Sequence, residues 1–188
     1  MPCREEETSV FWIETDQELA DAVASWDNCV GLDTEFIRTD TFYPIPGLYQ
    51  VASADQVFLI DPLTIEDWQP FSTFLMDPKT LIVMHACQED LEMLNHHLKV
   101  QPTSVVDTQF AHAFTGVDYS LSYANLVRRT IGVELHKQQT RSNWLQRPLS
   151  EEQLTYAADD VIYLVPMYQA LRERMLGGGR LSWFDEDM

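Results

Sequence analysis

The chain has 188 residues, with 12 Lys and Arg against 30 Asp and Glu, so its formal net charge is −18. A hydrophobic content of 45%, with 11% aromatic residues, is enough to bury a sizeable core, which excludes global disorder and favours one domain. The acid surplus also argues against a partner held by bulk electrostatics, whether nucleic acid or an anionic membrane surface.

The N-terminal half alternates short apolar runs with amphipathic segments. The pattern predicts helices from Asp16, as the cap, to about Trp26 and from Asp67 onward. Strands are expected at 11–13, 30–36, 48–52 and 57–60, with a turn at 54–56.

The C-terminal half is mainly helical. It begins with a buried-type strand at 81–84, a helix at 88–98 and a strand at 104–106, and a polar stretch covers 132–148 before a helix opened by Ser150. Three closely spaced early strands, followed by strands separated by helices, predict an α/β fold with a mixed sheet covered on both faces.

Three consecutive glycines, residues 177–179, follow a long helical pattern. Glycines in this position end a helix and favour a flexible segment. We therefore expect an acidic N-terminal tail at 1–9, one domain at 10–176, and a Gly-rich, acidic tail or truncated linker at 177–188.

The predicted compartment is the cytoplasm. The longest apolar stretches are far shorter than the roughly 18 residues of a membrane-spanning helix. The first residues are too acidic for a secretory or mitochondrial leader. The three cysteines are scattered and form no Cys-x-x-Cys pair, which favours a reducing environment.

Two acids lie two residues apart in the predicted strand 30–36. Asp33 and Glu35 would point to the same face of that strand, roughly 7 Å apart along the backbone. In an apolar strand the two carboxylates would repel each other and lose hydration unless a cation lay between them, and a divalent metal ion would serve. The alternative is a strand end that reaches solvent.

Three further polar residues lie on predicted helices. Tyr156 and Asp160 are four residues apart and therefore share a helix face. Asp90 lies in the first turn of the helix at 88–98. The alternative interpretations are a core aromatic with a surface acid, and an acid favoured by the helix dipole.

In order and context, these five residues resemble the pattern of the DEDD superfamily of 3′–5′ exonucleases, and the Tyr-x-x-x-Asp spacing resembles its DEDDy branch. The chain is most similar to the nuclease domain of the ribonuclease D family, from about residue 10 to residue 176. The matching stretches are 32–36, 59–63, 85–91, 107–109, 147–150 and 156–164. The resemblance implies a ribonuclease H-like fold, with a mixed five- to six-stranded sheet flanked by helices on both faces.

The resemblance also implies an activity, the hydrolysis of phosphodiester bonds from the RNA 3′ end with release of 5′-monophosphates by two divalent ions, Mg²⁺ or Mn²⁺. By similarity to the family, Asp33, Glu35 and Asp160 would hold one ion. Asp33 would bridge to the second ion, which Asp90 would support directly or through water. Tyr156 would orient the attacking water. Two alternatives stay open: a DNA 3′–5′ exonuclease, and a non-catalytic module for nucleic-acid binding or assembly.

Residues 128–147 hold five basic residues against one acid, a local charge of +4. This segment is the expected site for an RNA 3′ end, single-stranded or tRNA precursor-like. Candidate phosphate contacts are Lys137, Arg141 and Arg147, and Phe36 and Trp144 are candidates to stack on bases. Thr34 is a further substrate-contact candidate by resemblance. Solvated loop charges and core aromatics are the alternatives.

Overall fold

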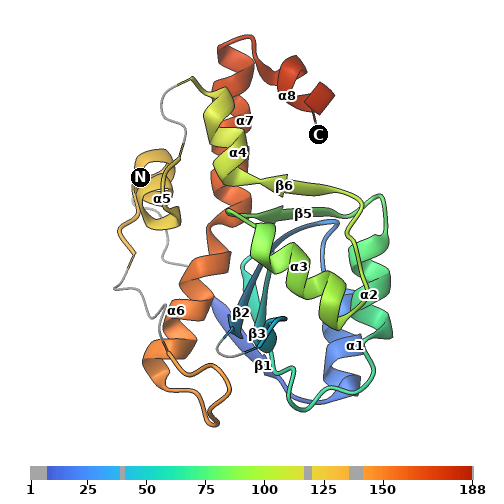
Figure 1. Cartoon of the computed structure of the whole chain (residues 1–188). Helices are drawn as coiled ribbons and strands as arrows, with labels where there is room; N and C mark the ends of the chain where they lie inside the picture. The colour runs from blue at the N-terminus through green and yellow to red at the C-terminus, as the bar shows by residue number, and fades with distance from the viewer. Residues whose placement is uncertain (1–7, 39–40, 117–119, 136–141, 188) are drawn as a thin grey trace.

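The computed structural model of the chain describes residues 8–38, 41–116, 120–135 and 142–187. Six strands form one mixed sheet in the spatial order β1-β4-β3-β2-β5-β6 (Figure 1). Strand β3 is antiparallel to both β2 and β4, and the other pairs are parallel. The strands are β1 (Ser9–Ile13), β2 (Cys29–Ile37), β3 (Ile45–Ser53), β4 (Gln56–Ile60), β5 (Leu81–Met84) and β6 (Val105–Asp107).

Helices cover both faces of this sheet (Figure 1). They are α1 (Asp16–Ser25), α2 (Gln69–Met76), α3 (Gln88–His97), α4 (Thr108–Phe114), α5 (Tyr123–Ile131), α6 (Glu151–Ile162), α7 (Leu164–Gly177) and α8 (Leu181–Asp187). The expected α/β class, with a mixed sheet flanked on both faces, is confirmed. Among the helices of the described residues, none has the length and apolar character to cross a membrane.

Two apolar clusters form the core, one on each face of the sheet. Helices α1, α2 and α3 contribute to the first cluster, and α4 to α8 contribute to the second. Strand β3 shows the alternation that separates them, because Tyr49 and Val51 belong to the first cluster and Leu48 and Ala52 to the second. Successive side chains of the central strands are therefore directed to different helical layers.

Two helices begin at residues other than those expected. The cap of α1 is Thr15, which forms a capping box with Glu18, and Asp16 instead accepts backbone N–H bonds from Glu66 and Asp67. Helix α2 begins at 69 rather than 67 because the Asp67 carboxylate accepts the N–H of residue 69 in a turn before the helix.

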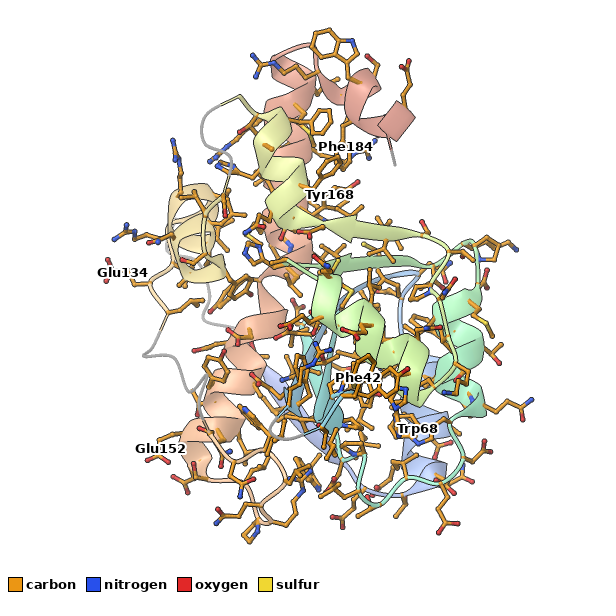
Figure 2. The ribbon with its side chains drawn as sticks, viewed as in Figure 1. Phe42, Trp68, Glu134, Glu152, Tyr168 and Phe184 are labelled. Carbon is orange, nitrogen blue, oxygen red and sulfur yellow. The ribbon has the colours of Figure 1, made fainter. Side chains whose placement is uncertain are left out.

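The segment after the glycines is folded. Residues 181–187 form α8, in which Phe184 is 1% exposed and packs against Phe114 and Tyr168 at ring-centroid distances of 5.5 and 6.4 Å (Figure 2). The expected flexibility is therefore wrong for 181–187, because burial of this aromatic ring stabilises the helix against the domain. The domain limits at residues 10 and 176 stay predictions.

Candidate active site

Three carboxylates meet beside the central strand. Asp33 and Glu35 lie on one face of β2, and Asp160 reaches them from α6. One carboxylate oxygen of each residue can be chosen such that all three lie within 4.8 Å of one another. No other group of three potential metal ligands occurs in the described part of the chain.

A glycine lets α6 approach β2 this closely. A Cβ atom on Gly31, two residues before Asp33, would lie 2.7 Å from the carbonyl oxygen of Val161 and 3.1 Å from Cβ of Leu164. Any other residue would therefore push the junction of α6 and α7 away from the strand. The role of Gly31 was missed in the sequence, although a lone glycine in an apolar strand was the available signal.

The fourth acid lies on the opposite side of β2. Asp90 is 8% exposed in the first turn of α3, and the hydroxyl of Thr34 donates a hydrogen bond to its carboxylate. Asp90 is not one of the three residues with mutually close oxygens, but, after burial, its charge is the largest cause of the raised pKa of Asp33. Thr34 is 6% exposed, so it supports an acid and does not present its hydroxyl on the surface.

Asp107 shapes the turn that leads into α3. Its carboxylate accepts backbone N–H bonds from Ala86 at 2.9 Å, Cys87 at 3.2 Å and Gln109 at 2.8 Å. Ala86 has a φ of 52°, a conformation that needs such support. The carboxylate therefore fixes the start of the helix that carries Asp90. In the sequence, the signal for this role is limited to an acid at the end of a strand.

Burial and neighbouring negative charges disfavour ionisation of the four acids. Burial is the largest cause at each of them, and neighbouring carboxylates add to it. The pKa of Asp33 lies well above its usual range, that of Glu35 is raised to about 8, and those of Asp90 and Asp160 are raised to about 6. An all-oxygen donor set that repels itself in this way fits a hard divalent cation.

Tyr156 lies next to this group. Its hydroxyl is hydrogen-bonded to the carboxylate of Asp160, four residues along α6. Burial, reinforced by that carboxylate, raises the pKa of Tyr156 well above its usual range. The phenol is therefore neutral at pH 7 and can orient a ligand through its hydroxyl, but it cannot act as a base.

Tyr123 is a second tyrosine that the sequence did not single out. It begins α5, and its hydroxyl donates to the backbone carbonyl of Asp159 at 3.0 Å. Burial raises the pKa of Tyr123, and the charges of Asp160 and Asp33 raise it further. The bond therefore ties α5 to the helix that carries two of the site residues.

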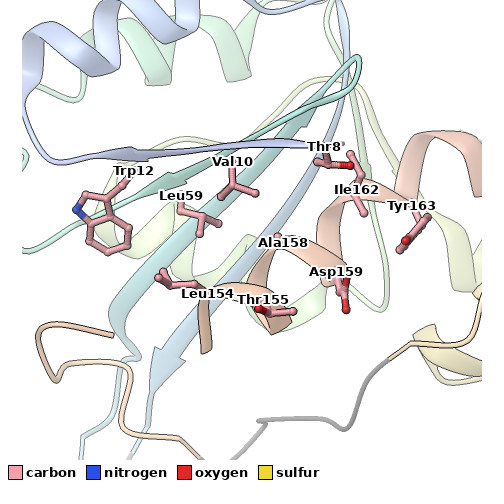
Figure 3. Close-up of a pocket in the computed structure, with 10 residues that line it drawn as sticks. All are labelled: Thr8, Val10, Trp12, Leu59, Leu154, Thr155, Ala158, Asp159, Ile162 and Tyr163. Carbon is pink, nitrogen blue, oxygen red and sulfur yellow. The ribbon is translucent and has the colours of Figure 1, made fainter. Parts of the chain in front are cut away.

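The opposite face of α6 lines an apolar groove. The groove has a volume of about 470 Å³ and lies between α6 and the edge of the sheet (Figure 3). Side chains of α6 that line it include Leu154, Ala158 and Asp159, whereas none of the acids described above does so. The two faces of α6 are therefore distinct, one apolar and one directed to the carboxylates.

Two of the side chains expected to contact substrate make contacts within the protein. Trp144 is 1% exposed in the second apolar cluster, so its ring is not presented to a base. The guanidinium of Arg147 makes two 2.6 Å bonds to the buried carboxylate of Asp61 and also donates to the carbonyls of Gly47 and Trp144. Burial contradicts the expected base stacking of Trp144. The phosphate contact of Arg147, whose guanidinium bonds Asp61 in this structure, stays a prediction.

The remaining candidates have different outcomes. Phe36 is half-buried on β2, next to Glu35, and stays a candidate for base stacking. Lys137 and Arg141 lie outside the described residues.

A substitution of Arg147 can distinguish its role as the ion-pair partner of Asp61 from the expected role as a phosphate contact. Arg147→Met should lower the free energy of unfolding by on the order of 2–4 kcal/mol, because it leaves the buried Asp61 carboxylate without its ion-pair partner. Arg38→Met, which removes an exposed pair with Glu92, should cost less than about 1 kcal/mol. Urea denaturation measures both values. A stable Arg147 variant with a raised KM for RNA would instead support the phosphate contact.

Comparison with known proteins identifies the family of the chain. Residues 10–176 match the 3′-5′ exonuclease family. Ribonuclease D of Pseudomonas paraeruginosa is 45% identical over 180 residues, which cover 95% of this chain and 48% of that protein. Ribonuclease D of Escherichia coli is 43% identical over 158 residues, which cover 82% of this chain and 42% of that protein.

Solved structures have the same fold. The crystal structure of Escherichia coli RNase D, described as an exoribonuclease involved in structured RNA processing, aligns with a TM-score of 0.85. The identity is 40%, and the alignment covers 92% of this chain and 47% of that chain. The catalytic core of RRP6 from Trypanosoma brucei, with 22% identity and a TM-score of 0.87, shares the fold.

The fold and the family match together define a nuclease. The chain belongs to the 3′-5′ exonuclease family, and within it the expected resemblance to the nuclease domain of ribonuclease D is confirmed. The chain spans about half the length of the curated relatives it matches.

Proposed function

We propose that this chain removes nucleotides from the 3′ end of RNA by hydrolysis and releases 5′-monophosphates. The observation that carries the proposal is the convergence of Asp33, Glu35 and Asp160, whose carboxylate oxygens lie within 4.8 Å of one another. RNA is the favoured substrate because the similar Escherichia coli protein is an exoribonuclease involved in structured RNA processing. A tRNA precursor-like 3′ end is the substrate type we favour.

The four acids would hold two divalent ions, Mg²⁺ or Mn²⁺. Asp33, Glu35 and Asp160 would bind one, and Asp33 with Asp90 would bind the second. When bound, such ions supply an activated water and a counter-charge for the departing 3′-oxygen. The chain itself contributes the fixed placement of its carboxylates, through the close approach at Gly31 and the bond from Thr34 to Asp90.

Tyr156 would orient the attacking water through its hydroxyl. Tyr156→Phe is expected to lower kcat by about 10²-fold, because a misplaced nucleophile costs that much, and also to weaken Mn²⁺ binding, because the hydroxyl bonds the Asp160 carboxylate. Tyr163→Phe is the matched control, because Tyr163 lines the groove on the other side of α6 (Figure 3). Single-turnover rates on labelled RNA and calorimetric Mn²⁺ titrations make the comparison. Equal kcat values for the two variants would exclude the role.

The upstream RNA strand would pass along α5. This helix is tied to the site through Tyr123, and its last turn carries the exposed Arg128 and Arg129. Arg128→Gln should flatten the slope of log affinity against log salt by about 0.7 for a 15-nucleotide RNA, because one phosphate contact is lost. A dinucleotide, whose single phosphodiester would lie at the carboxylates, should be unaffected. Lys79→Gln makes the same charge change in the turn after α2. It should leave the slope of log affinity against log salt unchanged for both RNAs.

The proposed activity is tested by a time course on 5′-labelled RNA and DNA of the same sequence, with Mg²⁺, Mn²⁺ or chelator. A ladder that shortens from the 3′ end of RNA, and only with metal, is the expected result. Preference for DNA would favour the DNA exonuclease instead. No shortening of either strand under any condition would favour a non-catalytic binding or assembly module.

The cytoplasmic location stays a prediction from the cysteine pattern.

A further inference from the structure

The buried amide of Gln50 lies next to the acids and has no role in the proposed reaction. Gln50 lies in the middle of β3 and is 0% exposed. Among the residues that the structure describes, neither its Nε2 nor its Oε1 has a hydrogen-bond partner. Unpaired polar atoms in a core are costly and rare, so a buried amide of this kind calls for a function or a missing partner.

The sheet register places Gln50 beside Asp33. The two residues are direct partners in the antiparallel pair of β3 and β2, so their side chains share a face and their Cβ atoms lie about 5 Å apart. On the other side of β3, the partner of Gln50 is Leu59.

The neighbours of Gln50 along β3 are apolar. Leu48 and Ala52 flank Gln50 on the same face of β3, and Ala157 and Val161 of α6 belong to the same buried cluster. Asp33 is therefore the polar group to which the sheet register brings the amide closest.

We propose that Gln50 is a positioning residue for the metal-binding acids: its amide, which has no hydrogen-bond partner in the described structure, bonds the Asp33 carboxylate when a divalent ion is bound and so fixes its orientation. The inference rests on the metal site proposed above. An amide suits this position because its N–H groups can bond a carboxylate without neutralising it. A Lys or Arg at the same place would compete with the metal ion for the charge of Asp33.

Gln50→Met keeps the side-chain volume and removes the amide. In metal-free protein its midpoint of thermal unfolding should equal or exceed that of the wild type, because unpaired polar atoms leave the core. Its calorimetric affinity for Mn²⁺ should fall by about 10- to 100-fold, the usual loss when a partner of a metal ligand is removed. Gln50→Leu repeats the test with a branched side chain.

Trp26→Phe is the control, because it removes another buried, unpartnered N–H, from the core cluster on the opposite face of the sheet. It should leave Mn²⁺ affinity within about twofold of the wild type. Failure of both Gln50 variants to fold, or Mn²⁺ affinity equal to the wild type, would overturn the assignment of Gln50 alone. Absence of Mn²⁺ binding by the wild type would instead overturn the metal site itself.

Discussion

Replacing Asp33 or Asp160 by Asn is expected to lower kcat on 5′-labelled RNA by about 10³-fold or more, with the fold retained. The amide has nearly the same shape as the carboxylate but cannot carry the charge that holds a divalent ion. The metal-free variants should unfold at the same temperature as the wild type or higher, because an acid whose ionisation the folded protein disfavours has been removed. Circular dichroism and single-turnover kinetics give the two readouts.

Asp159→Asn is the matched control for this experiment. Asp159 follows Ala158 on α6, next to Asp160 in sequence, but it lines the apolar groove (Figure 3). The same chemical change on that face should leave kcat within a few fold of the wild type. Near-normal activity of Asp33→Asn or Asp160→Asn would refute the metal assignment, whereas equal losses in all three variants would indicate a general effect on α6.

The metal-free protein is expected to lose stability as the pH rises from about 4 to about 8. Each acid of the cluster has a pKa in the folded protein above its unfolded value, so the folded state binds more protons in this interval and unfolding is favoured as they leave. Asp90 and Asp160, with pKa values of about 6, act up to about pH 6, and Glu35, with a pKa of about 8, acts up to about pH 8. The midpoint of thermal unfolding should fall by on the order of 5 °C or more.

Divalent metal should remove this pH dependence. Excess Mg²⁺ or Mn²⁺ at pH 8 should raise the unfolding midpoint, because the ion binds the ionised acids of the folded state. At pH 7 the binding of metal should release about one proton or more, since the pKa of Glu35 lies near 8 and that of Asp33 is also well raised. Calorimetry in buffers of different ionisation enthalpy counts these protons. Binding without proton release, or a metal-free protein most stable at pH 8, would contradict this assignment of the acids.

Much of the fold and of the site could be predicted because the signals are local. The strands 30–36 and 81–84 were recognisable as apolar runs, and both lie within or at observed strands. A two-residue spacing sufficed to place Asp33 and Glu35 on one face, and a four-residue spacing sufficed to place Tyr156 beside Asp160. These inferences need only the periods of a strand and a helix.

Residue order and spacing alone were thus enough to predict the order of the main strands and helices, the family resemblance and the acids of the proposed metal site. Which polar and aromatic side chains are buried or paired within the protein could be seen only in the tertiary structure. Arg147 pairs with an acid 86 positions earlier, and Thr34 bonds an acid 56 positions later. Trp144, Phe184 and Gln50 are buried by elements that the chain brings together only on folding. Burial and pairing depend on such distant partners, whereas residue spacing reports only on neighbours along the chain.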